Sequence, residues 1–144
     1  MGNYPGIIRS TEKNFMSDKI FVDTNILVYS VANDQRKRAI ADELLLTNDV
    51  VISPQVISEF VAVTLRKKIL ASTKAIDSAK QFMQVFHVTT MTAATIRSAL
   101  DIMTKYQFAY WDSLILAAAL ESACPFLYTE DLQDGQRIED ALII

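Results

Sequence analysis

The sequence predicts an α/β fold: a three-layer α/β/α sandwich with a central parallel sheet. Short apolar runs of strand length alternate with longer segments in which apolar residues recur at helical spacing. This alternation favours a parallel sheet whose crossover helices cover both of its faces. The length of 144 residues fits one such domain, and a hydrophobic content of 51% excludes a disordered chain.

The first 17 residues are expected to lie outside this domain. They carry Gly2, Pro5 and Gly6 without apolar periodicity, and no apolar segment of signal-peptide type follows them. We expect residues 1–17 to be an N-terminal extension, either flexible, artificially added, or preceding an alternative start at Met16. No linker or repeat divides the remainder, so residues 18–144 are expected to form one domain.

The first half of the domain shows a strand, a turn and a helix, followed by a second such unit. Lys19 to Val22 is a short apolar run typical of a buried strand. Ser53 followed by Pro54 is a good helix opening, because serine caps the helix and proline lacks an N–H group that would have no partner there. The expected elements are, in order, a strand at 19–22, a helix from 26, a helix at 39–46 with Ile40 and Leu44 on one face, a strand at 50–52 and a helix at 54–67.

The second half continues the alternation. In the helix expected from residue 92, Ile96, Leu100 and Met103 are predicted to face inward, because they recur at helical spacing. The expected elements are, in order, a helix at 73–85, a short strand at 85–89, helices at 92–106 and 110–122, and strands at 126–129 and 141–144.

Composition excludes several classes of protein. The apolar runs are broken by charge, and none approaches the roughly 18 to 20 residues that a membrane span needs. The single Cys124 cannot form an internal disulfide, so we expect a small buried residue and a cytoplasmic protein. A net charge of −3 means that binding of nucleic acid would need a local basic patch or a divalent metal.

Four carboxylates occupy positions where a charge is costly. Asp23 follows an apolar strand and precedes an apolar helix, and Asp131 follows the strand expected at 126–129. Glu59 shares a helix face with Val56 and Val63. Asp112 lies in the first turn of an apolar helix, where the helix dipole favours an anion. Helix capping for Asp23 and Asp112, and a position at the solvent rim for Glu59, are the alternative interpretations.

The four acids together indicate a metal site more strongly than any one of them. Ligands of open α/β sheets bind at the carboxyl ends of the strands, where these residues are expected to gather. Clustered carboxylates repel one another unless a cation lies between them. An all-oxygen set of ligands selects a hard ion, Mg²⁺ or Mn²⁺.

The motifs around these acids resemble the PIN-domain family. The resemblance covers about residues 18–144 and is closest to the VapC-like toxins of VapBC toxin–antitoxin pairs. The motifs appear in the order and spacing of that family. They are Phe21-Val22-Asp23-Thr24-Asn25, Ile57-Ser58-Glu59-Phe60, Tyr110-Trp111-Asp112-Ser113 and Leu127-Tyr128-Thr129-Glu130-Asp131.

The resemblance implies roles for particular residues. Asp23, Glu59, Asp112 and Asp131 would be the catalytic, metal-binding acids for one or two Mg²⁺ or Mn²⁺ ions. A supporting shell would consist of Thr24, Asn25 and Thr129. The reaction implied is endonucleolytic hydrolysis of RNA that leaves 5′-phosphate and 3′-hydroxyl ends, carried out by a homodimeric toxin whose partner is a small antitoxin.

Some assignments stay open at this stage. Glu130 or Asp134 could replace or assist Asp131, although Asp134 precedes Gly135 and also suits a turn. The basic residues Arg36, Lys37, Arg66 and Lys67 are candidate RNA contacts, or simply solvated helix ends. Tyr110 and Trp111 could stack on bases, but Trp111 is expected to pack in the core.

Two other functions compete with a nuclease. A phosphatase with an aspartyl nucleophile would need a second Asp and a Gly after Asp23, and Thr24-Asn25 does not supply them. The second alternative is a catalytically silent PIN-like module that binds RNA or protein, against which the presence of all four acids argues.

Overall fold

A six-stranded sheet lies at the centre of the part of the chain that the structure describes. This structure is a computed structural model, and it describes residues 18–130, 132, 135–139 and 142–144. The strands follow the order β3-β2-β1-β4-β6-β5 across the sheet. They are β1 (Lys19–Val22), β2 (Asp49–Ile52), β3 (His87–Val88), β4 (Phe126–Tyr128), β5 (Arg137–Ile138) and β6 (Leu142–Ile143).

The sheet is parallel except at one edge. β1 pairs in parallel with β2 on one side and β4 on the other, while β3 and β6 extend the sheet in the same sense. The predicted parallel sheet is thus confirmed. β5 pairs antiparallel with β6, and the sequence analysis missed it because a two-residue strand carries no alternating pattern. The extension expected over 1–17 and the beginning of the strand expected at 141–144 lie outside the described residues.

Six expected helices are present in the described chain, with local capping that explains their starts. Ser53 Oγ accepts a hydrogen bond from the Val56 N–H at 3.3 Å, as expected of a cap. Asp34 caps the second helix in the same way, so that helix begins four residues earlier than predicted. The helices are α2 (Thr24–Val31), α3 (Gln35–Thr47), α4 (Pro54–Arg66), α5 (Ser72–Val85), α6 (Ala93–Tyr106) and α7 (Tyr110–Glu121).

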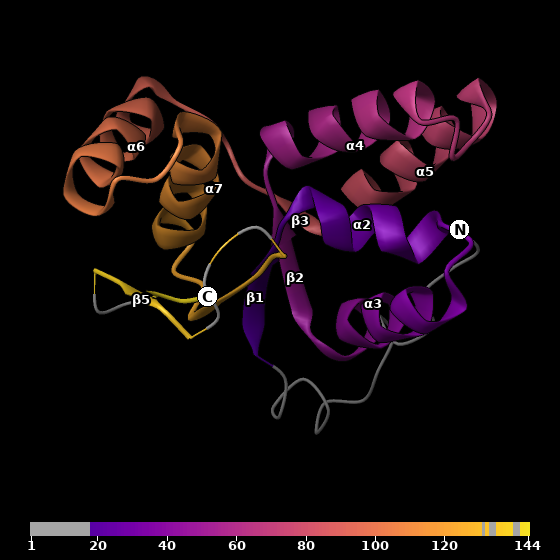
Figure 1. Cartoon of the computed structure of the whole chain (residues 1–144), viewed down its shortest axis with the longest axis horizontal. Helices are drawn as coiled ribbons and strands as arrows, with labels where there is room; N and C mark the ends of the chain where they lie inside the picture. The colour runs from indigo at the N-terminus through magenta and orange to yellow at the C-terminus, as the bar shows by residue number, and fades with distance from the viewer. Residues whose placement is uncertain (1–17, 131, 133–134, 140–141) are drawn as a thin grey trace.

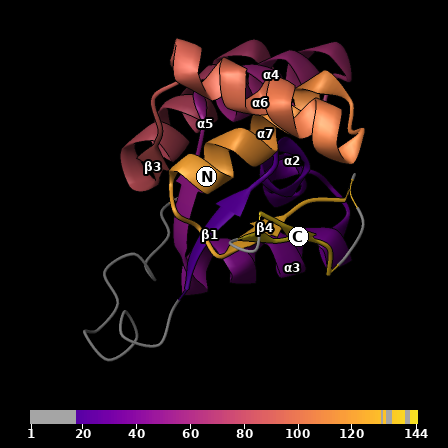
Figure 2. The same cartoon turned by 90° about the vertical axis from the view of Figure 1, so that its left-hand side faces the viewer.

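The helices cover both faces of the sheet, as the predicted sandwich requires. Figure 1 shows α6 and α7 on one side of β1 and β2, with α2 and α3 on the other and α4 and α5 above them. Figure 2, turned by 90°, shows α7 in front of the strands. α6 packs on α7, and α4 contacts both α2 and α5. Among the described residues, no helix is long and apolar enough to span a membrane.

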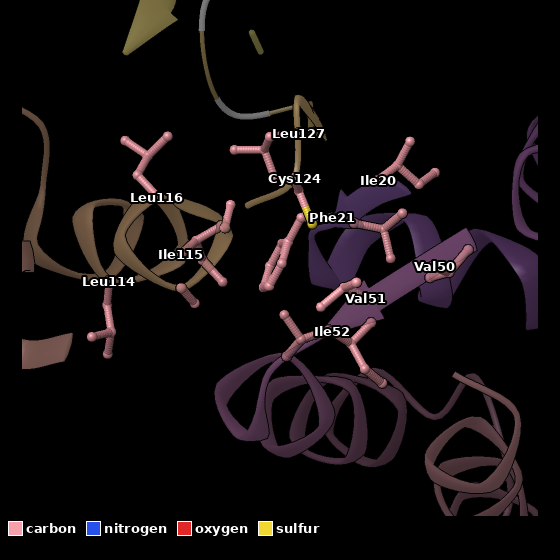
Figure 3. Close-up of a cluster of buried hydrophobic side chains, with 14 of the residues drawn as sticks. Ile20, Phe21, Val50, Val51, Ile52, Leu114, Ile115, Leu116, Cys124 and Leu127 are labelled. Atoms are coloured by element: carbon pink, nitrogen blue, oxygen red, sulfur yellow. The ribbon is translucent and has the colours of Figure 1, made fainter. Parts of the chain in front are cut away.

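One part of the hydrophobic core lies between α7 and the strands β1 and β2. Phe21 is fully buried, and Figure 3 shows its ring between Ile115 of α7 and Val51 of β2. Cys124 is 1% exposed, which confirms it as a small buried residue, and burial raises the pKa of its thiol to about 11. Ile20, Phe21 and Val22 are all fully buried, so the central strand that precedes Asp23 is packed on both of its faces.

The predicted inward face of α6 is wrong by one residue, and the buried face of α3 lies one residue beyond Ile40 and Leu44. Ile40 is 61% and Leu100 50% exposed, and Ile96 is also exposed, while Met103 is half-buried. The buried residues of α3 are Ala41 and Leu45, and those of α6 are Thr95, Ala99 and Ile102. Small residues on α6 let it approach the alanine-rich α7 closely, and this close packing outweighs the burial of the larger side chains.

Candidate active site

Asp23 lies at the carboxyl end of the central strand and is 6% exposed. Its Oδ1 accepts the N–H of Thr24 at 2.7 Å, so it caps α2. Its Oδ2 accepts the hydroxyl of Thr129 at 2.7 Å, across from β4. Strand order changes direction between β1 and β4, and this is where open α/β sheets bind ligands. The capping role and the site role therefore coexist in one carboxylate.

Thr24 connects Asp23 to a second acid. Its hydroxyl donates to Oε1 of Glu59 at 3.0 Å, while its N–H is bound by Asp23. Burial raises the pKa of Glu59, and the negative charges of Asp23 and Asp112 raise it further. Hydrogen bonding to Thr24 and Gln55 lowers that pKa in part. The half-buried Glu59 is thus repelled by the negative charges of Asp23 and Asp112, and a bound cation would reduce this repulsion.

The raised pKa of Glu59 predicts a pH-dependent stability in protein without metal. The folded state binds the Glu59 proton more tightly than the unfolded state, so its contribution to stability falls as pH rises from about 4.5 through the folded pKa. Glu59→Gln should therefore raise the melting temperature at pH 7 in EDTA. That gain should shrink as the pH approaches 4.5, and an equal gain at both pH values would contradict the prediction.

Asp112 and the acids after β4 complete the described carboxylates. Asp112 lies in the first turn of α7, as predicted, and is half-buried. Asp131 and its alternative Asp134 lie outside the described residues. Glu130 is exposed, and its carboxylate accepts a hydrogen bond from the Tyr29 hydroxyl, which raises the tyrosine pKa. Glu130 is therefore paired with Tyr29 at the edge of the site.

One pocket brings three of the predicted acids together. Its volume is about 490 Å³, within the range of small-ligand sites. Asp23, Glu59 and Asp112 line it, and so do Thr24 and Asn25 of the expected supporting shell. Oδ1 of Asn25 is buried and has no hydrogen-bond partner among the described residues. A buried oxygen without a donor is costly, so this atom suits a bound water, cation or hydroxyl.

Gln55 is a pocket residue that was not predicted from the sequence. It is buried, and its Nε2 donates to the main-chain oxygen of Trp111 at 3.2 Å. Its Oε1 is buried without a partner among the described residues. Gln55 lies one helical turn before Glu59. Two polar residues at i, i+4 spacing share one helix face, and this spacing could have identified Gln55 as a neighbour of Glu59 in the site. It ties the start of α7, and with it Asp112, to α4.

The candidate RNA contacts separate into two groups. Arg66 and Lys67, at the end of α4, line the pocket with the acids. Lys37 lines a second, more apolar pocket, where its Nζ lies 3.4 Å from the Tyr29 hydroxyl. Arg36 is exposed on α3. Only the pair on α4 is therefore placed beside the acids.

The donor atoms fit a hard divalent cation that keeps part of its water shell. Within the described part of the chain, no three Asp, Glu, His or Cys side chains are close enough together to enclose a metal. Mg²⁺ typically uses one or two carboxylates together with waters and substrate phosphate, so an open arrangement suits it. The oxygen donors of the pocket, including the unpartnered Asn25 Oδ1, match that preference.

The hydrogen bond from Thr129 predicts a measurable effect on the site. Thr129→Val removes the hydroxyl that orients Asp23 and keeps the volume of the side chain. We expect a loss of about 10- to 100-fold in Mn²⁺ affinity, typical of residues that orient ligands. Thr129→Ser keeps the hydroxyl and should bind nearly as well as the original protein. Equal affinity of the Val and Ser variants in calorimetric titration would refute this role.

Comparisons with known proteins show the family and the fold of this chain. A family model described as PIN domain matches residues 20–138. No curated protein sequence matches the chain. Several solved structures share its fold, and three of them are given below. Their sequence identities of 15 to 18% show a common fold but not a common function.

The first of these is the VapC20 toxin of Mycobacterium tuberculosis, described as cleaving the sarcin-ricin loop. It has 18% identity and a TM-score of 0.65, and the match covers 78% of this chain and 89% of that one. A toxin–antitoxin complex from Klebsiella pneumoniae has 15% identity and a TM-score of 0.66, with 87% and 96% covered. VapBC2 of Rickettsia felis, bound to a promoter DNA fragment, has 18% identity and a TM-score of 0.63, with 86% and 96% covered.

These neighbours place the fold among VapC structures, and the match to the family model confirms the predicted family. The family model covers well over half of the sequence. The chain therefore belongs to the PIN-domain family.

Proposed function

We propose that this protein is a divalent-metal-dependent endoribonuclease that hydrolyses RNA phosphodiester bonds. One observation carries the proposal: Asp23, Glu59 and Asp112 line one pocket at the carboxyl edge of the sheet in a PIN-domain chain. Three carboxylates around one pocket are a poor site for RNA phosphate by themselves, and they become a favourable one when Mg²⁺ or Mn²⁺ inverts the local charge.

The chain's own residues would divide the work. Asp23, Glu59 and Asp112 would hold one or two ions, with Asp131 as the fourth acid of the proposal. A bound ion supplies a water of lowered pKa and stabilises charge on the phosphate oxygens. Thr24 and Thr129 orient the carboxylates through the hydrogen bonds described above. Arg66 and Lys67 would contact flanking phosphates of the RNA.

We further propose that the enzyme acts in the cytoplasm as the toxin of a type II toxin–antitoxin pair. The support is the likeness of its fold to a VapC toxin and to two structures named as toxin–antitoxin or VapBC complexes. The proposal includes a small antitoxin as partner and a homodimer as the active form. Size-exclusion chromatography with light scattering tests the dimer directly.

The function is tested with purified protein and total RNA in Mg²⁺ or Mn²⁺, with and without EDTA. Asp112→Asn serves as the matched variant, because it removes the charge and keeps the size of the side chain. Mapping of the cut ends should show discrete 5′-phosphate ends that require both the metal and Asp112. Intact RNA in every reaction, from protein that binds Mn²⁺, would instead favour the silent binding module.

A further inference from the structure

Trp111 is a large aromatic side chain left open at the edge of the candidate active site. It is 62% exposed, which contradicts the expectation that it packs in the core. The start of α7 places it beside Asp112, and it lines the acidic pocket. The residues of α7 from Ser113 to Ala119 are buried, whereas Trp111 and Asp112 at the start of the helix border the pocket.

A second hollow adjoins the acidic pocket at this residue. The two hollows share Gln55, Glu59, Ala62 and Trp111 as walls. The second has a volume of about 610 Å³, and its remaining walls are mostly apolar: Pro54, Ser58, Met91, Tyr110 and Leu114. An apolar, aromatic compartment therefore opens directly from an acidic one.

Trp111 is held in place although its ring is exposed. Its main-chain oxygen accepts the hydrogen bond from Gln55 Nε2. Its ring packs edge-on against Tyr110, with centroids 5.0 Å apart and planes at 68°. Fixing an aromatic ring in this way lowers the entropy lost when a flat ligand stacks on it.

The face of α4 that lines the acidic pocket begins near Trp111 and ends at the basic residues Arg66 and Lys67. Gln55, Glu59, Ala62 and Arg66 follow one another along one face of that helix and all line the acidic pocket. From Gln55 to Arg66 the helix rises about 16 Å. An aromatic side chain therefore lies at one end of the acids and a cationic pair, Arg66 and Lys67, at the other.

We propose that Trp111 is a stacking subsite for one unpaired nucleobase next to the cleaved phosphate. The strand then runs along α4, with a neighbouring phosphate at Arg66 and Lys67. Every base offers a π-face, so aromatic stacking next to a phosphate site suits single-stranded RNA, whereas a duplex hides its base faces. This inference rests on the proposed nuclease function and adds to it a base-binding residue, Trp111. The competing occupant of the second hollow is another copy of the chain. It would cover the carboxylate of Glu59, which lines both hollows, and so bury a charge that is already half-buried.

The single tryptophan of the chain makes the proposal directly measurable. The Asp23→Asn protein, in which cleavage should be about 10³-fold slower, is titrated in Mg²⁺ with a ten-nucleotide oligoadenylate while Trp111 fluorescence is followed. An abasic strand of the same length and a ten-base-pair RNA duplex are the matched ligands. We expect saturable quenching by the oligoadenylate, with at most weak quenching by the other two.

Cleavage by the otherwise unmodified enzyme gives the second readout. Trp111→Ala should raise KM for an unpaired RNA by about 5- to 150-fold, the range for loss of one stacked base. Trp111→Phe should restore most of the affinity. Met83→Ala, at another exposed apolar residue, on α5, should leave KM unchanged.

The outcomes separate this proposal from the nuclease proposal. Base-dependent quenching without any cleavage would keep the stacking subsite and reject the nuclease. Cleavage with equal quenching by the abasic strand, or with KM unchanged in Trp111→Ala, would reject the subsite alone. A fluorescence spectrum that shifts on dilution of the protein, with no response to RNA, would assign Trp111 to an interface between two copies and overturn the subsite.

Discussion

Replacing Asp23 with Asn is expected to lower the RNA cleavage rate by about 10³-fold, since several kcal/mol of transition-state stabilisation depend on the ion that Asp23 would hold. Asp23 is the carboxylate that both neighbouring threonines orient, through Oδ1 and Oδ2. Asn keeps an oxygen that can cap α2, so the fold should persist. The rate is measured on a defined RNA under single-turnover conditions in Mg²⁺.

The control for Asp23→Asn is a carboxylate outside the pocket. Asp101 is exposed on α6, so Asp101→Asn should keep the full rate. Circular dichroism of both variants should match that of the original protein. A cleavage rate in Asp23→Asn within a factor of about three of the original would contradict the assigned role of this residue.

Replacing Phe21 with Ala is expected to lower the free energy of unfolding by about 3 to 5 kcal/mol, the usual cost of truncating a buried aromatic ring. Phe21 is fully buried in the central strand, and α7 and β2 pack around it (Figure 3). The strand cannot shift to fill the space, because β2 and β4 fix its register on both sides. The melting temperature should fall on the order of 10 °C.

A graded series makes the Phe21 prediction specific. Phe21→Leu keeps most of the apolar volume and should cost clearly less than Phe21→Ala. Chemical unfolding measured at equilibrium gives both values. Equal, small losses below about 1 kcal/mol for the two variants would show that the space around Phe21 collapses easily, against the packing described here.

The fold class could be predicted because strand-length and helix-length segments alternate clearly along the chain. β1 was recognised by its near-continuous apolar character and α4 by its Ser-Pro start. The predicted ends of both elements agree with the structure to within about one residue. β5 was missed because it owes its existence to pairing with β6 at the sheet edge. A two-residue strand is decided by such tertiary contact and leaves no local pattern.

Errors in the buried faces have a common physical origin. Leu100 was predicted to face inward, whereas its neighbour Ala99 is the buried residue. On α3, likewise, Ala41 is buried and the larger Ile40 beside it is exposed. Where two helices pack closely, small side chains take the contact, and a larger side chain remains partly exposed beside it. Sequence periodicity gives the direction of an apolar stripe only to within about one residue.

The gathering of acids could be predicted because Asp23 follows a strand, Asp112 opens a helix and Glu59 shares a helix face with apolar residues. Asp23, Glu59 and Asp112 line the same pocket, while Asp131 lies outside the described residues. Gln55 and Trp111 could not be assigned from the sequence. The role of Gln55 depends on a hydrogen bond to a residue 56 positions away, and the exposure of Trp111 depends on how α7 meets α4.

These acids are proposed to hold a divalent cation, and Mn²⁺ binding followed by electron paramagnetic resonance tests this claim most directly. Free Mn²⁺ gives a strong signal that decreases on binding. We predict saturable loss of this signal with one or two ions per chain, and much weaker loss in both Asp23→Asn and Asp112→Asn. Equal Mn²⁺ binding by the original protein and both variants would contradict the claim.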